Sequence, residues 1–155
     1  MTKKSNESDV CYYFKLLLYT AKEMNAKVTP MKYQKIFYLL LKEKGIDLGL
    51  DYEPFFFGVH SWKLQSCVEK LVELGEVREV VDEVVRDLIS GLVVGIVRRY
   101  ELNTDFKPSE KDKEVIEFFK EWVAKSRSEI LKYVYEKYPE DNRYEYIRDR
   151  VLRKS

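Results

Sequence analysis

Histidine and cysteine are scarce in this 155-residue chain, which contains only His60, Cys11 and Cys67. A zinc site takes three or four ligands, usually with a pair at CxxC spacing. The two cysteines have no such spacing, so a zinc site formed by one chain is excluded. We expect them to be buried thiols; the alternative is a disulfide, which hyperthermophile cytosols tolerate.

Glycine-rich phosphate loops are missing as well. The six glycines form neither GxGxxG nor GxxxxGK[ST], which argues against a dinucleotide or nucleotide site. His60 precedes Ser61, but no nucleophile elbow or triad spacing surrounds the pair. Carboxylates alternate with lysines at helical i,i+4 spacing, as on a solvated helix face. We therefore expect no enzyme, no cofactor and no metal.

Long apolar runs and side-chain amides are also rare. No run approaches the ~18 residues of a membrane-spanning helix, and the first residues, MTKKSNESDV, lack the apolar core of a secretory signal. We expect a cytoplasmic protein without membrane contact. Two glutamines and four asparagines against 35% charged residues are typical of hyperthermophile proteins, which predicts a thermophilic archaeal source.

The chain has ample material for a packed core, with 45% apolar and 14% aromatic residues. Its length fits one domain. Apolar residues at 3–4 spacing predict a helix over 10–24. Thr29 as N-cap and Pro30 open a second helix that ends at Gly45. Ser61 caps a third helix over 61–74, and the three together resemble a helix-turn-helix core.

Residues 76–102 allow two interpretations. Their first half has apolar residues at a spacing that fits a helix better than a strand, namely Val77, Val80, Val81, Val84, Val85, Leu88 and Ile89. Five of these seven are valines, however, which favour strands. Ser90-Gly91 is a turn signal, and a strand follows it. The choice is a hairpin or a helix followed by a strand, and periodicity alone selects the second.

The remaining segments are a linker and a helical C-terminal extension. Residues 46–58 predict a linker with at most one short extended segment. Apolar stripes predict a fourth helix around Trp122, a fifth ending before Pro139, and a short basic tail helix whose apolar face carries Tyr144, Ile147 and Val151. We expect a single domain over 1–155, in which residues 108–155 pack on a core formed by residues 10–105.

Three stretches resemble the Panacea antitoxin domain and its uncharacterised archaeal relatives. TPMKYQKIFYLL, residues 29–40, is similar to the "KLQKLLYLA" helix of that family. FGVHSWKL, residues 57–64, stands where its members have "YGPYS..L", with Val59 and His60 in place of the usual proline and aromatic residue. LKYVYEKYPE, residues 131–140, resembles the "LLRYVYEKYPE" close of the archaeal branch.

The resemblance implies a mainly α fold with a small β-hairpin (α+β), a winged-helix-like core with additional C-terminal helices. The hairpin would be the wing, at residues 76–102, so we adopt a hairpin there against the periodicity. Studied members of the family are antitoxins that neutralise toxins, and others are described as regulators. The resemblance therefore implies a non-enzymatic binding protein with a cognate toxin or another protein as its partner.

Double-stranded DNA is the alternative partner. If the 61–74 helix is a recognition helix, its first turns would reach base edges. The candidate DNA-binding residues are Lys63, Gln65, Ser66, Lys70, Arg98 and Arg99. Residues 69–87, however, carry seven acidic residues against three basic ones, a net charge of −4 that would repel phosphates unless the acids face away.

Protein contact has its own candidates. The aromatic segment 52–62 offers Phe55, Phe56, Phe57, His60 and Trp62, although the three phenylalanines could equally fill the core. A homodimer is the default assembly, because small winged-helix proteins often pair through terminal helices. The sequence thus predicts an antitoxin-like or regulatory protein that acts through protein–protein contact, with a DNA-binding regulator as the alternative.

Overall fold

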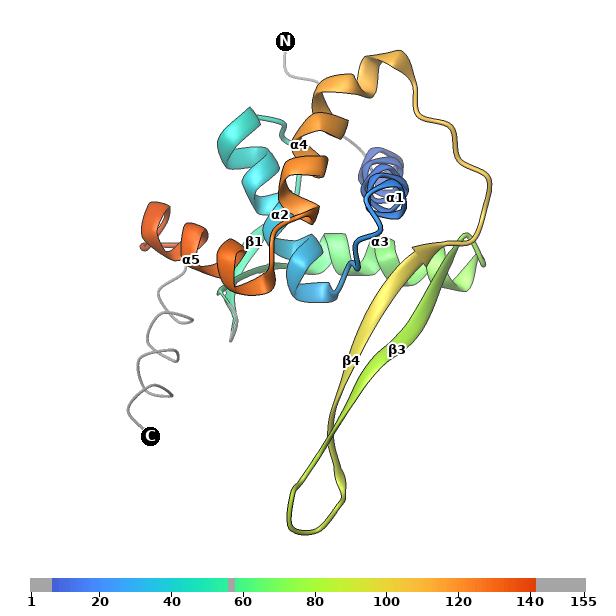
Figure 1. Ribbon diagram of the computed structural model, residues 1–155. Helices are drawn as coiled ribbons and strands as arrows, with labels where there is room; N and C mark the ends of the chain where they lie inside the picture. The colour runs from blue at the N-terminus through green and yellow to red at the C-terminus, as the bar shows by residue number, and fades with distance from the viewer. Residues whose placement is uncertain (1–6, 56–57, 142–155) are drawn as a thin grey trace.

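The computed structural model describes residues 7–55 and 58–141 (Figure 1). Within these residues the fold is a mixed α+β arrangement of five α-helices, one short 3₁₀ helix and two separate two-stranded antiparallel sheets. In chain order the elements are α1 (Glu7–Glu23), α2 (Pro30–Lys44), β1 (Tyr52–Phe55), β2 (Gly58–Ser61), α3 (Trp62–Glu73), β3 (Val77–Arg86), β4 (Val93–Leu102), η1 (Glu110–Asp112), α4 (Lys113–Val123) and α5 (Arg127–Lys137).

The first two helices form where their sequence patterns predict them. Helix α2 begins at Pro30, whose fixed φ suits a first helical turn. It ends at Gly45, which adopts a left-handed φ of +67° that costs glycine least. Thr29 occupies the N-cap position, as predicted, although its side chain makes no capping hydrogen bond.

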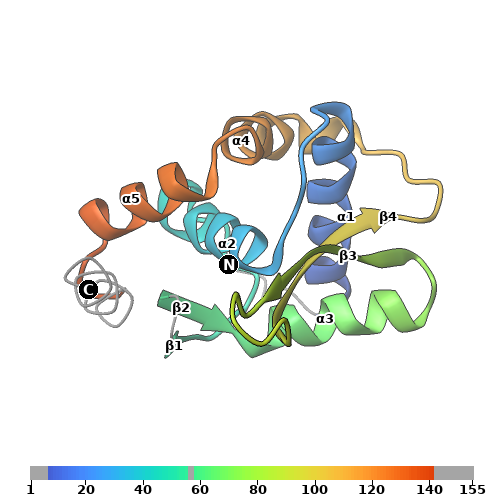
Figure 2. The same cartoon turned by 60° about the horizontal axis from the view of Figure 1, so that its bottom comes forward.

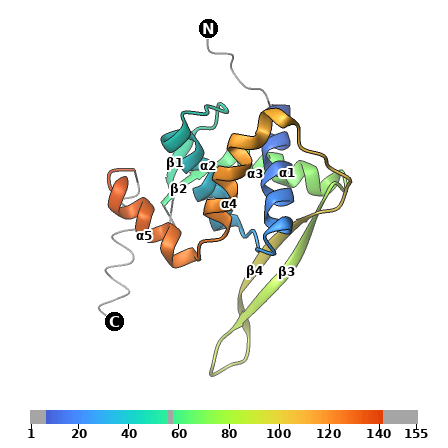
Figure 3. The same cartoon turned by 45° about the horizontal axis from the view of Figure 1, so that its top comes forward.

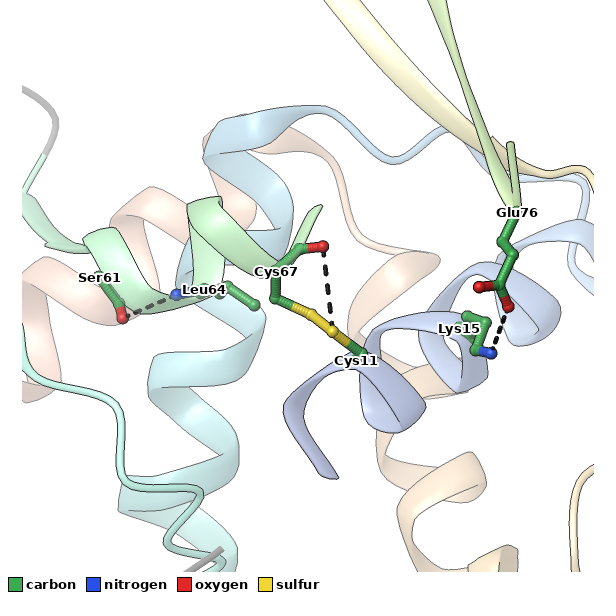
Figure 4. The surroundings of a disulfide bond; sticks show 6 residues. All are labelled: Cys11, Lys15, Ser61, Leu64, Cys67 and Glu76. Carbon is green, nitrogen blue, oxygen red and sulfur yellow. Dashed lines mark hydrogen bonds and ion pairs between the residues drawn. A yellow bond between two sulfur atoms is a disulfide. The ribbon is translucent and has the colours of Figure 1, made fainter. Parts of the chain in front are cut away.

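Helix α3 is capped as predicted and is bonded to α1. The Leu64 amide donates to the Ser61 hydroxyl over 3.3 Å. One turn further on, Cys67 forms a disulfide with Cys11 of α1, with 5.7 Å between the two Cα atoms (Figure 4). The structure therefore contains the disulfide alternative and not the pair of thiols. Beyond the other end of α3, Lys15 of α1 and Glu76 form an ion pair of 2.9 Å.

Residues 52–61 form a second, unexpected hairpin. β1 and β2 pair in register from Tyr52 opposite Ser61 to Phe55 opposite Gly58. The expectation of a linker with at most one extended segment was therefore wrong in this region. The hairpin leads directly into α3, so it determines where that helix begins.

The segment from 77 to 102 is a hairpin of two ten-residue strands, as adopted from the family resemblance. The helix that periodicity predicts for the first half is wrong. β3 contains a bulge between Val81 and Glu83, which shifts the two-residue alternation by one position. Because of the bulge, valines that are three and four positions apart in the sequence can all belong to one strand. This spacing imitates the apolar stripe of a helix.

One continuous core joins the N-terminal and C-terminal helices. α1 contacts α3, α4 and β4, whereas α2 contacts β2, α4 and α5 (Figure 2). The largest fully buried side chains include Phe14, Phe37 and Phe119, which come from α1, α2 and α4. Tyr38 in the middle of α2 contacts the rings of both Tyr52 and Tyr138.

Polar contacts fix the C-terminal helices. A capping box between Ser109 and Asp112 precedes α4, and Tyr12 of α1 donates to the Asp112 carboxylate. α5 is held to α2 through Glu43, whose carboxylate accepts hydrogen bonds from Tyr133, Tyr138 and Lys137. The expected tail helix at 144–151 lies outside the described residues.

Candidate interaction surface

The hairpin of residues 77–102, called the arm below, is anchored to the helical body at its base and by an ion pair between Asp82 and Lys27. Val77 is buried, and the Tyr100 amide donates to the Val28 carbonyl over 3.0 Å. The Tyr100 ring contacts Phe14 and Tyr33 in edge-to-face arrangements. These apolar contacts set the direction in which the arm leaves the body.

The loop at the end of the arm is held by its own hydrogen bonds. The Asp87 carboxylate accepts the backbone amides of Ile89 and Ser90, at 3.2 and 2.7 Å. Gly91 has a φ of +74°, a conformation that suits glycine, and its carbonyl accepts a hydrogen bond from Arg86. The loop therefore uses its polar groups internally and leaves its aliphatic side chains outside.

The outer part of the arm, residues 81–97 and called the distal arm below, is apolar and exposed. Figures 1 and 3 show that it extends away from the helices with no other labelled element beside its tip. Leu88 and Ile89 at the tip are fully exposed. The exposed aliphatic residues, each at least 41% accessible, are Val81, Val84, Val85, Leu88, Ile89, Leu92, Val93, Val94 and Ile96.

These aliphatic residues lie on both faces of the distal arm. Val84 is opposite Ile96 on one face, and Val85 is opposite Gly95 on the other. Directly opposed residues in an antiparallel pair share a face, and the next pair uses the opposite face. An aliphatic surface on both faces of a two-stranded ribbon is unusual for a strand pair exposed to water, which normally has at least one polar face.

The arginines proposed as DNA contacts are ion-paired with carboxylates of the arm itself. Arg98 lies 2.6 Å from Glu79. Arg99 bonds both Asp82, at 3.1 Å, and Glu101, at 2.6 Å. The hydrogen bond with Glu101 raises the pKa of the Arg99 guanidinium. The acidic residues of β3 therefore face the arginines of β4 and neutralise them.

The proposed recognition face of α3 is also engaged within the chain. Lys63 contacts the Asp51 carboxylate and the Gly49 carbonyl, each at 3.2 Å. The amide of Gln65 accepts from His60 and donates to Glu69. Ser66 and Lys70 are exposed on the same helix. The structure thus brings the four α3 candidates onto one helix, beside carboxylates that lower its positive potential.

Two of the five aromatic candidates form a small cluster at the start of α3. The rings of His60 and Trp62 lie 4.5 Å apart, and the Trp62 indole donates to Glu53 over 3.2 Å. Burial lowers the pKa of His60, although the hydrogen bond to Gln65 opposes this shift. Trp62 remains 46% exposed. Phe56, Phe57 and the side chain of Phe55 lie outside the described residues.

A groove of about 640 Å³ lies between the arm, including the distal-arm residues Ile96 and Val97, and α2 and β2. His60 and Met31 line one side of it, and Ile96 and Tyr100 line the other. Within the described residues, no group of three or more His, Cys, Asp or Glu side chains could hold a metal ion. None of the helices in this part of the chain is both long and apolar enough to span a bilayer.

The distal arm is the surface that sequence reasoning missed, because its residues were assigned to a wing and not examined as a contact. The sequence feature that could have indicated this surface is the stretch from Leu92 to Val97, which contains only aliphatic residues and one glycine. The chain matches no family model and no curated protein.

Proposed function

We propose that this chain is a non-catalytic binding protein, antitoxin-like or regulatory, that acts through protein–protein contact made by the distal arm. The observation that carries this proposal is the set of nine exposed aliphatic residues on a projecting hairpin. Summed over the two faces and the tip, they expose roughly 1,000 Å², whereas the largest single apolar patch on an ordinary monomer is about 300–600 Å². So much exposed apolar surface on one projecting hairpin is typical of a contact site.

Contacts between the three stretches that resemble the Panacea antitoxin domain support the proposed relationship. Gln34 of the first stretch forms two hydrogen bonds with Ser61 of the second. Tyr38 of the first contacts the ring of Tyr138 in the third, with 5.6 Å between centroids. The three stretches therefore belong to one connected region of the fold.

The order of elements supports a winged-helix-like architecture. Three helices, α1 to α3, precede the β3–β4 hairpin, and the disulfide joins the first helix to the third. In this proposal the arm is the wing and α4 and α5 are the additional C-terminal helices. The composition supports a cytoplasmic protein of a thermophilic archaeon, in which few thermolabile amides are tolerated.

Electrostatics favour protein over DNA as the partner. Duplex DNA attracts proteins mainly through phosphate contacts to unneutralised lysines and arginines. Arg98, Arg99 and Lys63 each lie within 3.2 Å of a carboxylate of this chain. A duplex would have to displace these contacts, while its phosphates gain nothing from the aliphatic distal arm.

The partner experiment uses the immobilised full chain to capture proteins from a thermophilic archaeal extract. Each captured protein is then purified and titrated against wild type and against a Leu88→Lys/Ile89→Lys variant. We expect binding to weaken about tenfold or more in this variant, because hot-spot contacts are apolar and desolvated. The control variant Leu74→Lys alters an exposed leucine at the end of α3, away from the arm, and should bind like wild type.

A second experiment measures binding to a random pool of duplex DNA at low salt. The proposal predicts that no sequence is enriched. Enrichment of a sequence, lost on Lys63→Ala/Gln65→Ala, would establish the DNA-binding alternative. A purified partner that binds the arm variant as tightly as wild type would contradict the proposed role of the arm.

A further inference from the structure

We infer that the distal arm is covered by the distal arm of a second copy of this chain, so that the protein is a homodimer joined through its arms and not through its terminal helices. This inference rests on the proposed function, since it names the partner of the same surface. It follows from the area, the fold and the charge distribution of the distal arm.

The exposed area of the distal arm approaches what a dimer needs. A standard protein–protein interface buries about 800 Å² on each partner. The nine aliphatic residues of the distal arm expose roughly 1,000 Å² on each chain, divided between its two faces and its tip. Two arms packed face to face would bury about half of this area on each chain, so the polar neighbours of these residues must complete an interface of standard size.

A cover over the distal arm would stabilise it. A two-stranded hairpin without a packed face is at best marginally stable in water. The distal arm continues from the anchored base of the arm, but its sheet has no third strand among the described residues. A second copy is available wherever the first one is, whereas a different protein is not.

The strand edges suit pairing between identical arms. The outer edges of β3 and β4 pair with no other strand in the described part of the chain. Such edges are templates for another strand. A two-fold axis perpendicular to the sheet pairs the same edge strand of the two copies antiparallel and leaves the other edge of each arm unpaired.

Charge opposes this association only modestly. The net charge of each chain is +1, whereas the distal arm carries the carboxylates of Asp82, Glu83 and Asp87 against one arginine, Arg86. Three of these four charged groups are engaged locally. Asp82 binds Arg99 and Lys27, Asp87 accepts loop amides, and Arg86 donates to the Gly91 carbonyl. The aliphatic side chains are therefore free to form the contact between copies.

Light scattering after size exclusion tests this inference on the full chain at micromolar concentration. Wild type should have twice the 18.6 kDa mass of one chain. A Leu92→Lys/Val94→Lys variant should have half the wild-type mass, because it places charges at the centre of the interface. The control Met24→Lys/Leu74→Lys changes two exposed apolar residues outside the arm and should remain dimeric.

Two outcomes overturn the inference. A wild-type chain that is monomeric leaves the arm available to a different protein, so the proposed function would stand without the homodimer. A dimer that persists in the arm variant is joined elsewhere. If the variant does not fold, hydrogen exchange of wild type decides: amides of residues 81–97 should exchange more slowly as concentration rises through the dissociation range, and concentration-independent exchange there overturns the inference.

Discussion

The side chain of Gln34 pairs with the backbone of Ser61 as a neighbouring strand would. Its amide donates to the Ser61 carbonyl over 3.0 Å, and its oxygen accepts the Ser61 amide over 2.8 Å. Both residues are buried. Since Ser61 is the N-cap of α3, this pair sets the position of α3 relative to α2.

Replacing Gln34 should therefore lower the free energy of unfolding by more than replacing Gln65, which is only partly buried. In Gln34→Ala the Ser61 amide and carbonyl lose their partners in a buried site, and we expect the free energy of unfolding to fall by about 2–4 kcal/mol. Gln65→Ala, which removes only side-chain contacts near the surface, should cost less than about 1 kcal/mol. Chemical denaturation followed by circular dichroism measures both, and equal losses would contradict this account.

Truncation of the two tryptophans should lower the free energy of unfolding by very different amounts. Trp122 is 3% exposed and packs against Tyr133 and Phe118, whereas Trp62 is 46% exposed. Trp122→Ala should lower the free energy of unfolding by about 3–5 kcal/mol, as other buried aromatic truncations do. Trp62→Ala should lower it by less than about 1 kcal/mol. Thermal and denaturant unfolding of both variants would test this difference.

The disulfide between Cys11 and Cys67 closes a loop across 56 positions. A cross-link of this kind typically stabilises a fold by about 2–4 kcal/mol, chiefly by restricting the unfolded chain. Wild type should unfold at a lower temperature after reduction, whereas Cys11→Ser/Cys67→Ser should be insensitive to reductant. Mass spectrometry of the denatured, unreduced chain should find neither cysteine alkylated; alkylation of both would show free thiols.

The contact between α2 and α5 should weaken at acidic pH because it depends on Glu43. Burial alone would raise the pKa of Glu43, but hydrogen bonds from Tyr133, Tyr138 and Lys137 lower it below its ordinary value of 4.5. Since the folded pKa is depressed, the stabilisation is present above the unfolded pKa and is lost as pH falls through the folded pKa.

Glu43→Gln should accordingly reduce the free energy of unfolding by about 1 kcal/mol at pH 7. It should also flatten the decline of stability between neutral pH and pH ~3. Glu136→Gln, on the exposed side of α5, is the matched control and should keep the wild-type pH profile. An unchanged profile in Glu43→Gln would show that other carboxylates produce the acid sensitivity.

Local sequence signals were sufficient for the helices. Apolar stripes, Pro30 at the first turn of α2, Ser61 as the cap of α3 and Gly45 as a left-handed end all act within a few residues, and the structure has each of them. Thr29 also stands at the predicted N-cap position of α2, where its side chain makes no capping hydrogen bond.

The strands were less predictable because their pattern depends on partners. In β3 the valines lie on both faces of the strand, and a bulge interrupts their alternation between Val81 and Glu83. Their spacing in the sequence therefore resembles that of a helix, and only the pairing with β4 identifies the strand. β1 and β2 are four residues each, too short for any periodicity to be read. In both hairpins, each strand forms because it pairs with its partner across a turn.

By itself the sequence determined the helices, most of their ends and the amount of apolar material, since these follow from residue type and local spacing. Only the tertiary structure decided that Cys11 meets Cys67, that Arg98 and Arg99 are neutralised by carboxylates, and that the apolar residues of 81–96 lie outside the core. The physical reason is that burial and charge pairing are properties of residues distant in sequence, which come together only when the chain folds.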